Sequence, residues 1–321
     1  MGLKICSDHR EENHRVYHVP VMVEETVSHW MTDRDGIYVD ATLGGGGHAE
    51  ALLDRLTEHG CLIGIDRDEE SLAEAAERLR RFGLSAILRR CAFSRMGTLI
   101  SELGIDEVSG VLFDLGISSH QIDCPGRGFS YQLDGPLDMR LGQDGHTRTA
   151  AEIVNTYSEQ ALVELFFRYG EERRSRPIAR RICSLRTRVP FERTAQLRDA
   201  ILSVIPGRMP QKTLARIFQA LRIEVNDEIG ELEQGLETAI SMLKTGGRLA
   251  VLSYHSLEDG TVKGVFRNYA RGCHCPPGFP VCVCGAQPIL KVIGRRMASA
   301  EETARNARAR SARLRVAEKI Q

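Results

Sequence analysis

Hydrophobic and polar positions in the first 115 residues alternate between two periods. Short runs of apolar and β-branched residues predict strands at 37–41, 61–65, 85–89 and 110–114. Between the second and third runs, apolar residues recur at helical spacing until Gly83 ends the pattern. Strands that alternate with helices are typical of βα units, so this segment is predicted to form a parallel sheet.

The pattern becomes purely helical after Arg140. Polar residues that favour helix starts precede apolar periodic segments there, at Ser158, Ser175 and Thr194. The βα pattern resumes with a long helix, a strand at 248–254 and further strands within 288–294 and 312–320. We therefore expect an α/β core, residues 1–140 and 223–321 with a basic C-terminal tail, interrupted by a helical domain at 141–222.

Composition is that of an ordinary globular protein. Of the 321 residues, 42% are hydrophobic and 27% are charged, which argues against a disordered or fibrous chain. The first twenty residues contain no apolar run of the kind found in signal peptides, and no later stretch approaches a membrane span. We expect a soluble cytoplasmic protein with no membrane partner.

The net charge of zero conceals a strong asymmetry along the chain. Between Arg168 and Arg222 the chain has fourteen basic and four acidic residues. Between Lys291 and Gln321 it has nine basic and three acidic residues. Locally concentrated positive charge is what phosphate contacts require, although solvated helix faces produce the same pattern. Charge alone leaves nucleic-acid binding open.

Four consecutive glycines, Gly44 to Gly47, follow the first strand and precede a helical pattern. A glycine turn at a helix start presents backbone N–H groups to a ligand without side-chain obstruction. Gly44, Gly46 and Ala49 also match the dinucleotide pattern G-x-G-x-x-A, which is a weak signal by itself. No Gly-Lys-Ser/Thr follows the glycines, so a P-loop is excluded.

Acidic residues at strand ends narrow the choice of ligand. Asp66 ends the second strand, where its carboxylate would accept hydrogen bonds from ribose hydroxyls of either NAD or S-adenosylmethionine. The alternative for Asp66 is a helix N-cap or a turn residue. Asp40 and Asp114 end two further strands, and an acidic site favours the sulfonium cation of S-adenosylmethionine over a pyrophosphate.

Six ordered sequence blocks carry a family resemblance. They are "HVPVMVEETV", "DATLGGGGHAEALL", "GIDRD", "FDLGISSHQIDCPGRGFSYQLDGPLDMRL", "RIFQALRIEVNDEIGELE" and "YHSLEDGTVK". With them the chain resembles the bacterial small-subunit ribosomal RNA cytosine N4-methyltransferases. The resemblance implies a class I, Rossmann-like methyltransferase core with an inserted helical domain, and methyl transfer from S-adenosylmethionine to the exocyclic amine of one cytidine in the decoding region of 16S rRNA.

The resemblance also implies particular site residues and partners. The implied cofactor contacts are Gly46, Gly47, His48, Asp66, Phe93, Asp114 and Gln121. The implied partner is 16S rRNA, within the small ribosomal subunit, and a homodimer is left open. Phe129 and Tyr131, with neighbouring arginines, are placed either to hold an unstacked base or to pack over the cofactor site.

Two residues are candidates for the chemistry. The cytosine amine is a weak nucleophile, so a catalyst should accept a hydrogen bond from its N–H and align the reacting atoms. Asp114 is the preferred acceptor. His255 follows the fifth strand and is equally well explained as a structural hydrogen-bonding residue. Attack at the ring carbon would require a cysteine nucleophile, and Cys124 is the nearest one in sequence to Asp114.

The cysteines fall into one cluster and five scattered residues. The cluster, "CHCPPGFPVCVC", contains Cys273, Cys275, Cys282 and Cys284. Four thiolates can close a tetrahedral zinc site, and four reduced thiols in a surface loop are the alternative. The scattered cysteines are expected to be reduced.

Two other functions compete with methyl transfer. An NAD-dependent oxidoreductase is favoured only by the G-x-G-x-x-A match. A non-catalytic ribosome assembly factor would keep the same fold without the reaction.

Overall fold

A computed structural model describes residues 20–142, 147–205, 210–272, 275, 281 and 283–321. The chain divides into two compact units. The first, an α/β unit, comprises the described part of His18–Gly116 together with Ile229–Gln321, and the second is a helical unit over Ile117–Glu228. The helical unit therefore begins earlier than the 141–222 predicted from the sequence.

The earlier boundary has a packing explanation. Residues between 117 and 139 lack a regular helical pattern, so the sequence assigns them to the core. In the structure, Phe129, Leu137 and Met139 are buried in the hydrophobic cluster of the helical unit. Burial of apolar side chains in one cluster determines which unit an irregular segment belongs to.

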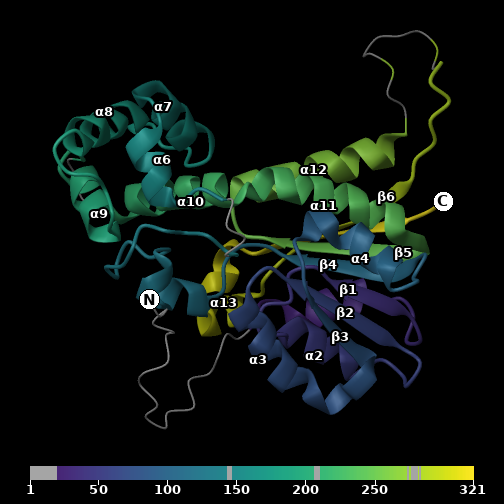
Figure 1. Cartoon of the computed structure of the whole chain (residues 1–321). Coiled ribbons are helices and arrows are strands. Elements are labelled where there is room, and N and C mark those ends of the chain that lie inside the picture. Colours follow the sequence, from purple (N-terminus) through teal and green to yellow (C-terminus); the bar gives the residue numbers. More distant parts are fainter. Residues whose placement is uncertain (1–19, 143–146, 206–209, 273–274, 276–280, 282) are drawn as a thin grey trace. The chain divides into compact units, whose positions relative to one another are not determined.

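One seven-stranded sheet, in the order β3-β2-β1-β4-β5-β7-β6, forms the centre of the α/β unit as described (Figure 1). Its strands are β1 (Ile37–Asp40), β2 (Cys61–Asp66), β3 (Ala86–Arg90), β4 (Val108–Asp114), β5 (Leu243–Ser253), β6 (Leu290–Met297) and β7 (Arg313–Lys319). The first five pair in parallel, and β7 is antiparallel to β5 and β6. The order reverses between β1 and β4, as in doubly wound folds, so the predicted Rossmann-like α/β class is confirmed.

Side chains on the central strands alternate between two buried faces. Val111 and Phe113 of β4 belong to one cluster, while Leu112 belongs to another. The first face packs against α4 (Met96–Glu102), α11 (Glu228–Met242) and α12 (Ser256–Arg271). The second packs against α1 (Val23–Trp30), α2 (Gly47–Leu53) and α3 (Glu69–Leu79). Because helices cover both faces of the sheet, the sequences of the central strands are continuous apolar runs.

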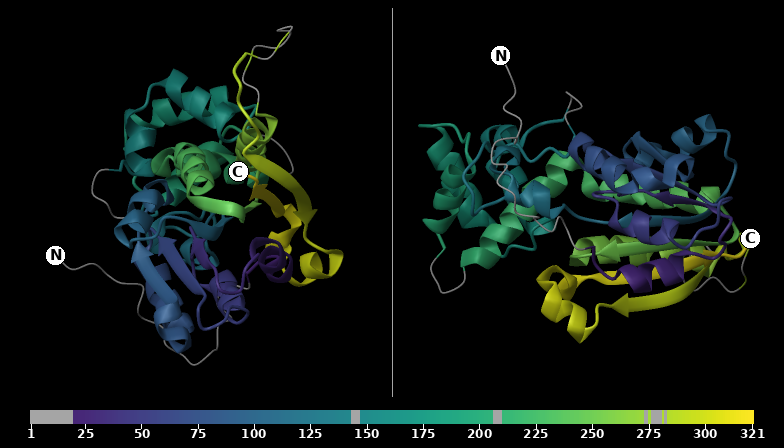
Figure 2. Two further views of the ribbon diagram at one scale, coloured as in Figure 1. Left: turned by 90° about the vertical axis from the view of Figure 1, so that its right-hand side faces the viewer. Right: turned by 90° about the horizontal axis from the view of Figure 1, so that it is seen from below.

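The C-terminal segment completes the sheet. The chain runs from β6 through α13 (Ala300–Arg305) and the 3-10 helix η4 (Ala307–Ser311) into β7. Figure 2 shows this yellow segment lying along the edge of the sheet. Arg313, the first residue of β7, pairs with Ser253, the last residue of β5. The α13–η4 segment is therefore at the carboxyl edge of the parallel strands.

The helical unit contains α5 (Ser119–Asp123), α6 (Ala150–Thr156), α7 (Glu159–Arg168), α8 (Ser175–Arg186), α9 (Thr194–Leu202) and α10 (Pro210–Asn226). Ser158 caps α7 by accepting a hydrogen bond from the Ala161 N–H, as predicted. Thr194 is not the cap of α9, because Arg193 holds that position. The Thr194 hydroxyl instead accepts from Gly135 N and donates to the Leu133 carbonyl.

In the described ranges, no helix combines the length and the apolar character that a bilayer crossing needs.

Candidate active site

The glycine loop joins β1 to α2. The structural reason for having glycine differs from one position of the loop to the next. Gly44 and Gly46 have φ of +51° and +79°, values that favour glycine. A Cβ on Gly46 would lie 3.3 Å from the Ala75 side chain, and a Cβ on Gly47 would lie 2.6 Å from Pro20. Close packing thus explains the absence of side chains at these two positions. Gly44 is the open one, since only the Thr42 carbonyl would lie within 4 Å of its Cβ.

Asp66, at the end of β2, holds the glycine loop. Its Oδ2 accepts a hydrogen bond from Gly44 N at 2.8 Å, and its Oδ1 accepts one from Asp68 N at 2.9 Å. Burial raises the pKa of the Asp66 carboxyl to about 6, against the lowering effect of these backbone bonds. The N-cap of α3 is Asp68, so the N-cap alternative for Asp66 is wrong. Its contact with a ribose stays a prediction.

Asp40, at the end of β1, is the most deeply buried carboxyl of the site. Only 2% of its surface is exposed, and its Oδ1 accepts from Thr42 N at 3.1 Å. Burial, followed by the negative charges of Asp114 and Asp66, raises its pKa to about 8. Thr42 also accepts a hydrogen bond from Asp114 N at 2.5 Å, which ties the ends of β1 and β4 together.

Asp114, at the end of β4, is approached by two side chains from different elements. Its Oδ1 accepts a hydrogen bond from the Tyr254 hydroxyl at 2.7 Å. Its Oδ2 lies 3.5 Å from Nδ1 of His48 in the first turn of α2. The carboxylate is 16% exposed, so it remains reachable from solvent.

His48 has a buried side chain directed to Asp114 and to the protein backbone. Its Nε2 lies 2.9 Å from the Val21 carbonyl oxygen, which only accepts, so Nε2 carries a hydrogen. Nδ1 then donates to Asp114 only when the ring is protonated. The ring is 5% exposed. The predicted contact of His48 with the cofactor stays a prediction.

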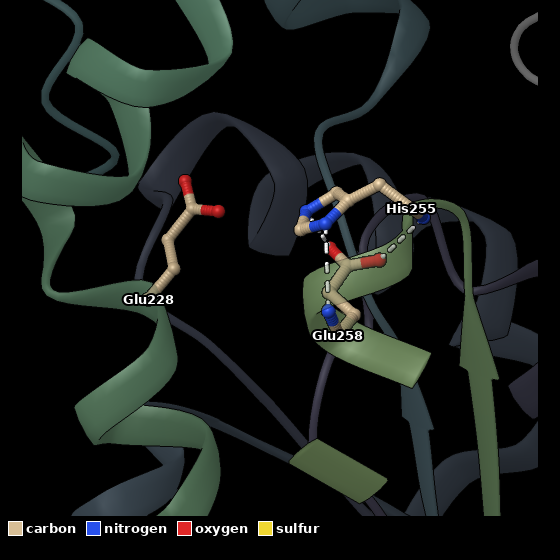
Figure 3. Close-up of side chains that lie close together, drawn as sticks. All are labelled: Glu228, His255 and Glu258. Carbon is tan, nitrogen blue, oxygen red and sulfur yellow. Dashed lines mark hydrogen bonds and ion pairs between the residues drawn. The ribbon is translucent and has the colours of Figure 1, made fainter. Parts of the chain in front are cut away.

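His255 is the N-cap of α12. The Glu258 N–H donates to its Nδ1 at 3.4 Å, and its Nε2 lies 2.9 Å from the Glu258 carboxylate (Figure 3). Nδ1 thus caps the first turn of the helix, which agrees with the structural alternative for this residue, whereas Nε2 is buried and makes no hydrogen bond among the described residues. A catalytic role for His255 stays a prediction.

Phe93 and Gln121 also have local packing roles. Phe93 contacts Phe113 edge to face, with ring centroids 5.5 Å apart. Gln121 forms a capping box with Ser118 at the start of α5, in the helical unit, and is 5% exposed. Contacts of either residue with a cofactor stay predictions.

Two of the four clustered cysteines, Cys273 and Cys282, lie outside the described residues, so the zinc site stays a prediction. Among the scattered cysteines, Cys61, Cys91 and Cys183 are unbridged, as expected. The expectation of a reduced Cys124 is wrong, because this residue is disulfide-bonded and 6% exposed. It offers no thiolate for attack at a ring carbon.

Tyr254, the donor to Asp114, was not among the site residues predicted from the sequence. It lies in the "YHSLED" block directly after β5, so its position at a strand end was the available signal. Nothing in its sequence neighbourhood indicates that it faces a residue 140 positions away.

Three carboxylates at the ends of adjacent strands fit a cationic ligand. Asp66, Asp40 and Asp114 end β2, β1 and β4, which are neighbours in the sheet. Each would repel a pyrophosphate and would attract the sulfonium and ammonium groups of S-adenosylmethionine. The raised pKa of Asp40 is the expected property of a carboxyl whose cationic partner is a ligand. The strand order and this acidic edge define the class I methyltransferases.

Comparisons with known proteins agree with this class. A model of the MraW methylase family matches residues 15–320, so the chain belongs to that family. A Carboxydothermus hydrogenoformans relative, named ribosomal RNA small subunit methyltransferase H, is 48% identical over 94% of this chain and 98% of its own length. Relatives of the same name from Geobacter sulfurreducens and Trichlorobacter lovleyi are 48% and 45% identical, over 94% and 95% of this chain and 99% and 98% of their own.

The chain is thus a methyltransferase that uses S-adenosylmethionine. This overturns the dinucleotide-dependent oxidoreductase and the non-catalytic assembly factor as alternatives, and the G-x-G-x-x-A match reflects the shared turn of nucleoside-binding folds.

Proposed function

We propose that this methyltransferase modifies the exocyclic N4 amine of one cytidine in 16S rRNA, in the decoding region of the small ribosomal subunit. The names of the relatives support the RNA substrate. The observation that carries the chemistry is the half-buried Asp114 carboxylate at a strand end, held by one hydroxyl donor and beside one histidine. A cytoplasmic location follows from a ribosomal substrate, and a homodimer stays a prediction.

Asp114 has the geometry of an acceptor for the amine. Tyr254 occupies one lone pair of Oδ1, and a carboxylate has about four acceptor directions, so this 16% exposed side chain has acceptor capacity beyond that bond. A carboxylate that accepts the amine N–H increases electron density on nitrogen and aligns it for in-line attack. Methyl transfer forms one nitrogen–carbon bond and breaks one carbon–sulfur bond, which leaves a neutral thioether, and Asp114 would take the surplus proton from N4.

The remaining residues would bind and orient the methyl donor. S-adenosylmethionine supplies an electrophilic methyl group on a sulfonium. Asp66 would accept from the ribose hydroxyls, and the open backbone at Gly44 would leave room for the amino-acid end. Asp40, whose pKa is raised to about 8 by burial, would ionise more readily with the cation bound and would then add negative charge to the site.

Nucleoside mapping of rRNA tests the proposed function. A deletion strain should lack one N4-methylated cytidine, and the purified protein with S-adenosylmethionine should restore it on small subunits or on their RNA. Asp114→Asn should reduce the rate at least a hundredfold, because general-base and positioning effects are of that order. Asp106→Asn, an exposed aspartate before β4, should match the wild type. Methylation at cytosine C5 or at a ribose hydroxyl would contradict the proposal.

A further inference from the structure

Tyr254 is fixed in place by both of the elements it joins. Directly before it, β5 pairs with β4, and the Leu115 N–H donates to the Leu252 carbonyl at 3.0 Å. Directly after it, α12 begins, and the Glu258 carboxylate accepts from Tyr254 N at 2.7 Å. Glu258 is 3% exposed, so this anchor is shielded from water. The phenol is therefore presented to Asp114 with little freedom to move.

Most charged groups near Asp114 and Tyr254 are acidic, so an uncharged hydroxyl is a suitable hydrogen-bond donor to the Asp114 carboxylate. Asp40 and Asp66 end the two strands that follow β4 in the sheet, and Glu258 on α12 and Glu302 on α13 add negative charge near Tyr254. On the other side, His48 of α2 assists only when its ring is protonated. Burial, together with the Asp114 charge, raises the pKa of Tyr254 well above 10, so the hydroxyl keeps its proton at every assay pH.

We propose that Tyr254 is a positioning residue for methyl transfer, which holds the Asp114 carboxylate ionised and aimed at the substrate amine. This inference rests on the proposed role of Asp114. A hydrogen bond to the charged form of an acid stabilises that form, and the Tyr254 hydroxyl donates such a bond to Asp114 Oδ1 at 2.7 Å. Glu258 acts through Tyr254 by fixing its backbone.

The test compares Tyr254→Phe with Tyr38→Phe. The first removes the hydroxyl and keeps the ring. The second removes a buried hydroxyl of the same unit, which bonds to Thr32 N, Asp33 N and the Asp33 carbonyl near the start of β1. Both variants lose hydrogen bonds and some stability, but only Tyr254→Phe changes the environment of Asp114.

Two measurements are made on both variants. Carboxyl carbons are followed by NMR in free protein labelled with carbon-13 aspartate, with the Asp114 signal assigned by its loss in Asp114→Asn. In Tyr254→Phe this signal should titrate about one pH unit higher than in the wild type. The acid limb of kcat for methyl transfer should move by the same amount, with about a tenfold loss below it and recovery above it. KM for the cofactor should change less than kcat.

The outcomes separate the two proposals. An unchanged titration of Asp114 in Tyr254→Phe overturns the inference, whatever the enzyme methylates. A moved titration with an unmoved kcat profile overturns it as well, because Asp114 ionisation would then not serve the reaction. A shift of equal size in Tyr38→Phe would reveal a general effect of lost stability and would also overturn it. Parallel shifts in Tyr254→Phe alone support it, even if the methylated atom proves different from N4.

Discussion

Asp40 is a carboxyl group with one hydrogen bond to backbone and almost no water, placed beside two other carboxylates. Ionisation of such a group in the free protein is unfavourable, because neither solvent nor a positive charge compensates it. Its pKa of about 8, against an ordinary value of 3.8, has a direct consequence for stability. Between these two values the folded chain holds a proton that the unfolded chain releases, so stability falls as pH rises.

Asp40→Asn should therefore remove a pH-dependent loss of stability. The amide oxygen can still accept from Thr42 N, but the residue no longer ionises. Urea unfolding of cofactor-free protein at pH 5 and pH 9 should show a decrease in the free energy of unfolding that is about 4 kcal/mol smaller in the variant than in the wild type. Asp106→Asn should retain the full decrease. Equal decreases in all three proteins would show that Asp40 does not titrate in this range.

The glycines of the loop look alike in the sequence but have different surroundings in the structure. A row of glycines predicted room for a ligand, and Gly44 is indeed open. Gly46 and Gly47 are bare because α3 and Pro20 pack against them, which no local pattern reveals. Absence of a side chain is the same sequence signal whether the space is filled by a ligand or by the protein.

At the scale of elements, the start of α12 performs two tasks. Glu258 anchors Tyr254 and His255, while Asp259 joins the helix to the sheet. Asp259 Oδ1 accepts from Arg315 Nε at 2.7 Å, and its Oδ2 accepts from Arg313 at 2.9 Å. Burial acts to raise the pKa of Asp259, but the bonds and charges of Arg315 and Arg313 outweigh it, so the pKa lies below its ordinary value.

Asp259→Asn should loosen α12 from β7. The variant leaves two arginines without their carboxylate, and we expect a loss of about 2 kcal/mol in the free energy of unfolding at pH 7. Because the pKa of Asp259 is lowered, its contribution is present at neutral pH and is lost as the pH falls, so the two proteins should converge in acid.

The control is Asp54→Asn. Asp54 also binds an arginine, Arg81, through both oxygens, but the two side chains are 50% and 57% exposed. Exposed pairs contribute little, so this variant should lose less than about 0.5 kcal/mol. An equal loss in both variants would show that burial of the Asp259 cluster is not what stabilises the junction.

At the scale of the whole molecule, the basic C-terminal segment is part of the sheet and not a separate tail. β6, α13, η4 and β7 all lie within it. Arg305 and Arg310 are exposed on α13 and η4, at the carboxyl edge that also carries Asp40 and Asp114. Positive charge beside an acidic methyl-transfer site is suited to phosphates on either side of a target nucleotide.

Replacing Arg305 and Arg310 by Gln should weaken RNA binding through lost phosphate contacts. Anisotropy titrations with a small-subunit rRNA fragment at several salt concentrations should show lower affinity and a salt slope reduced by about 1.5 units. Arg80→Gln serves as the matched control, since this residue is 77% exposed but follows α3 at the opposite edge of the sheet. An equal effect of Arg80→Gln would indicate nonspecific attraction and contradict a docking role for α13 and η4.

The order of elements, the α/β class and the acidic strand ends could all be predicted from the residues alone. Strand and helix periods are local properties, and parallel strands necessarily bring their carboxyl ends to one edge. Asp40, Asp66 and Asp114 were therefore predictable as neighbours. The family blocks predicted the type of enzyme in the same way. Each block consists of consecutive residues, so it is visible without the fold.

The contacts that each of those residues makes depend on how elements far apart in the chain pack together. The extent of the helical unit depended on where Phe129 and Met139 are buried, not on any repeat in the sequence. The contact between Tyr254 and Asp114 spans 140 residues and requires β4 and β5 to be paired first. Long-range contacts of this kind follow from the packing of whole elements, and no local pattern of residue types encodes them.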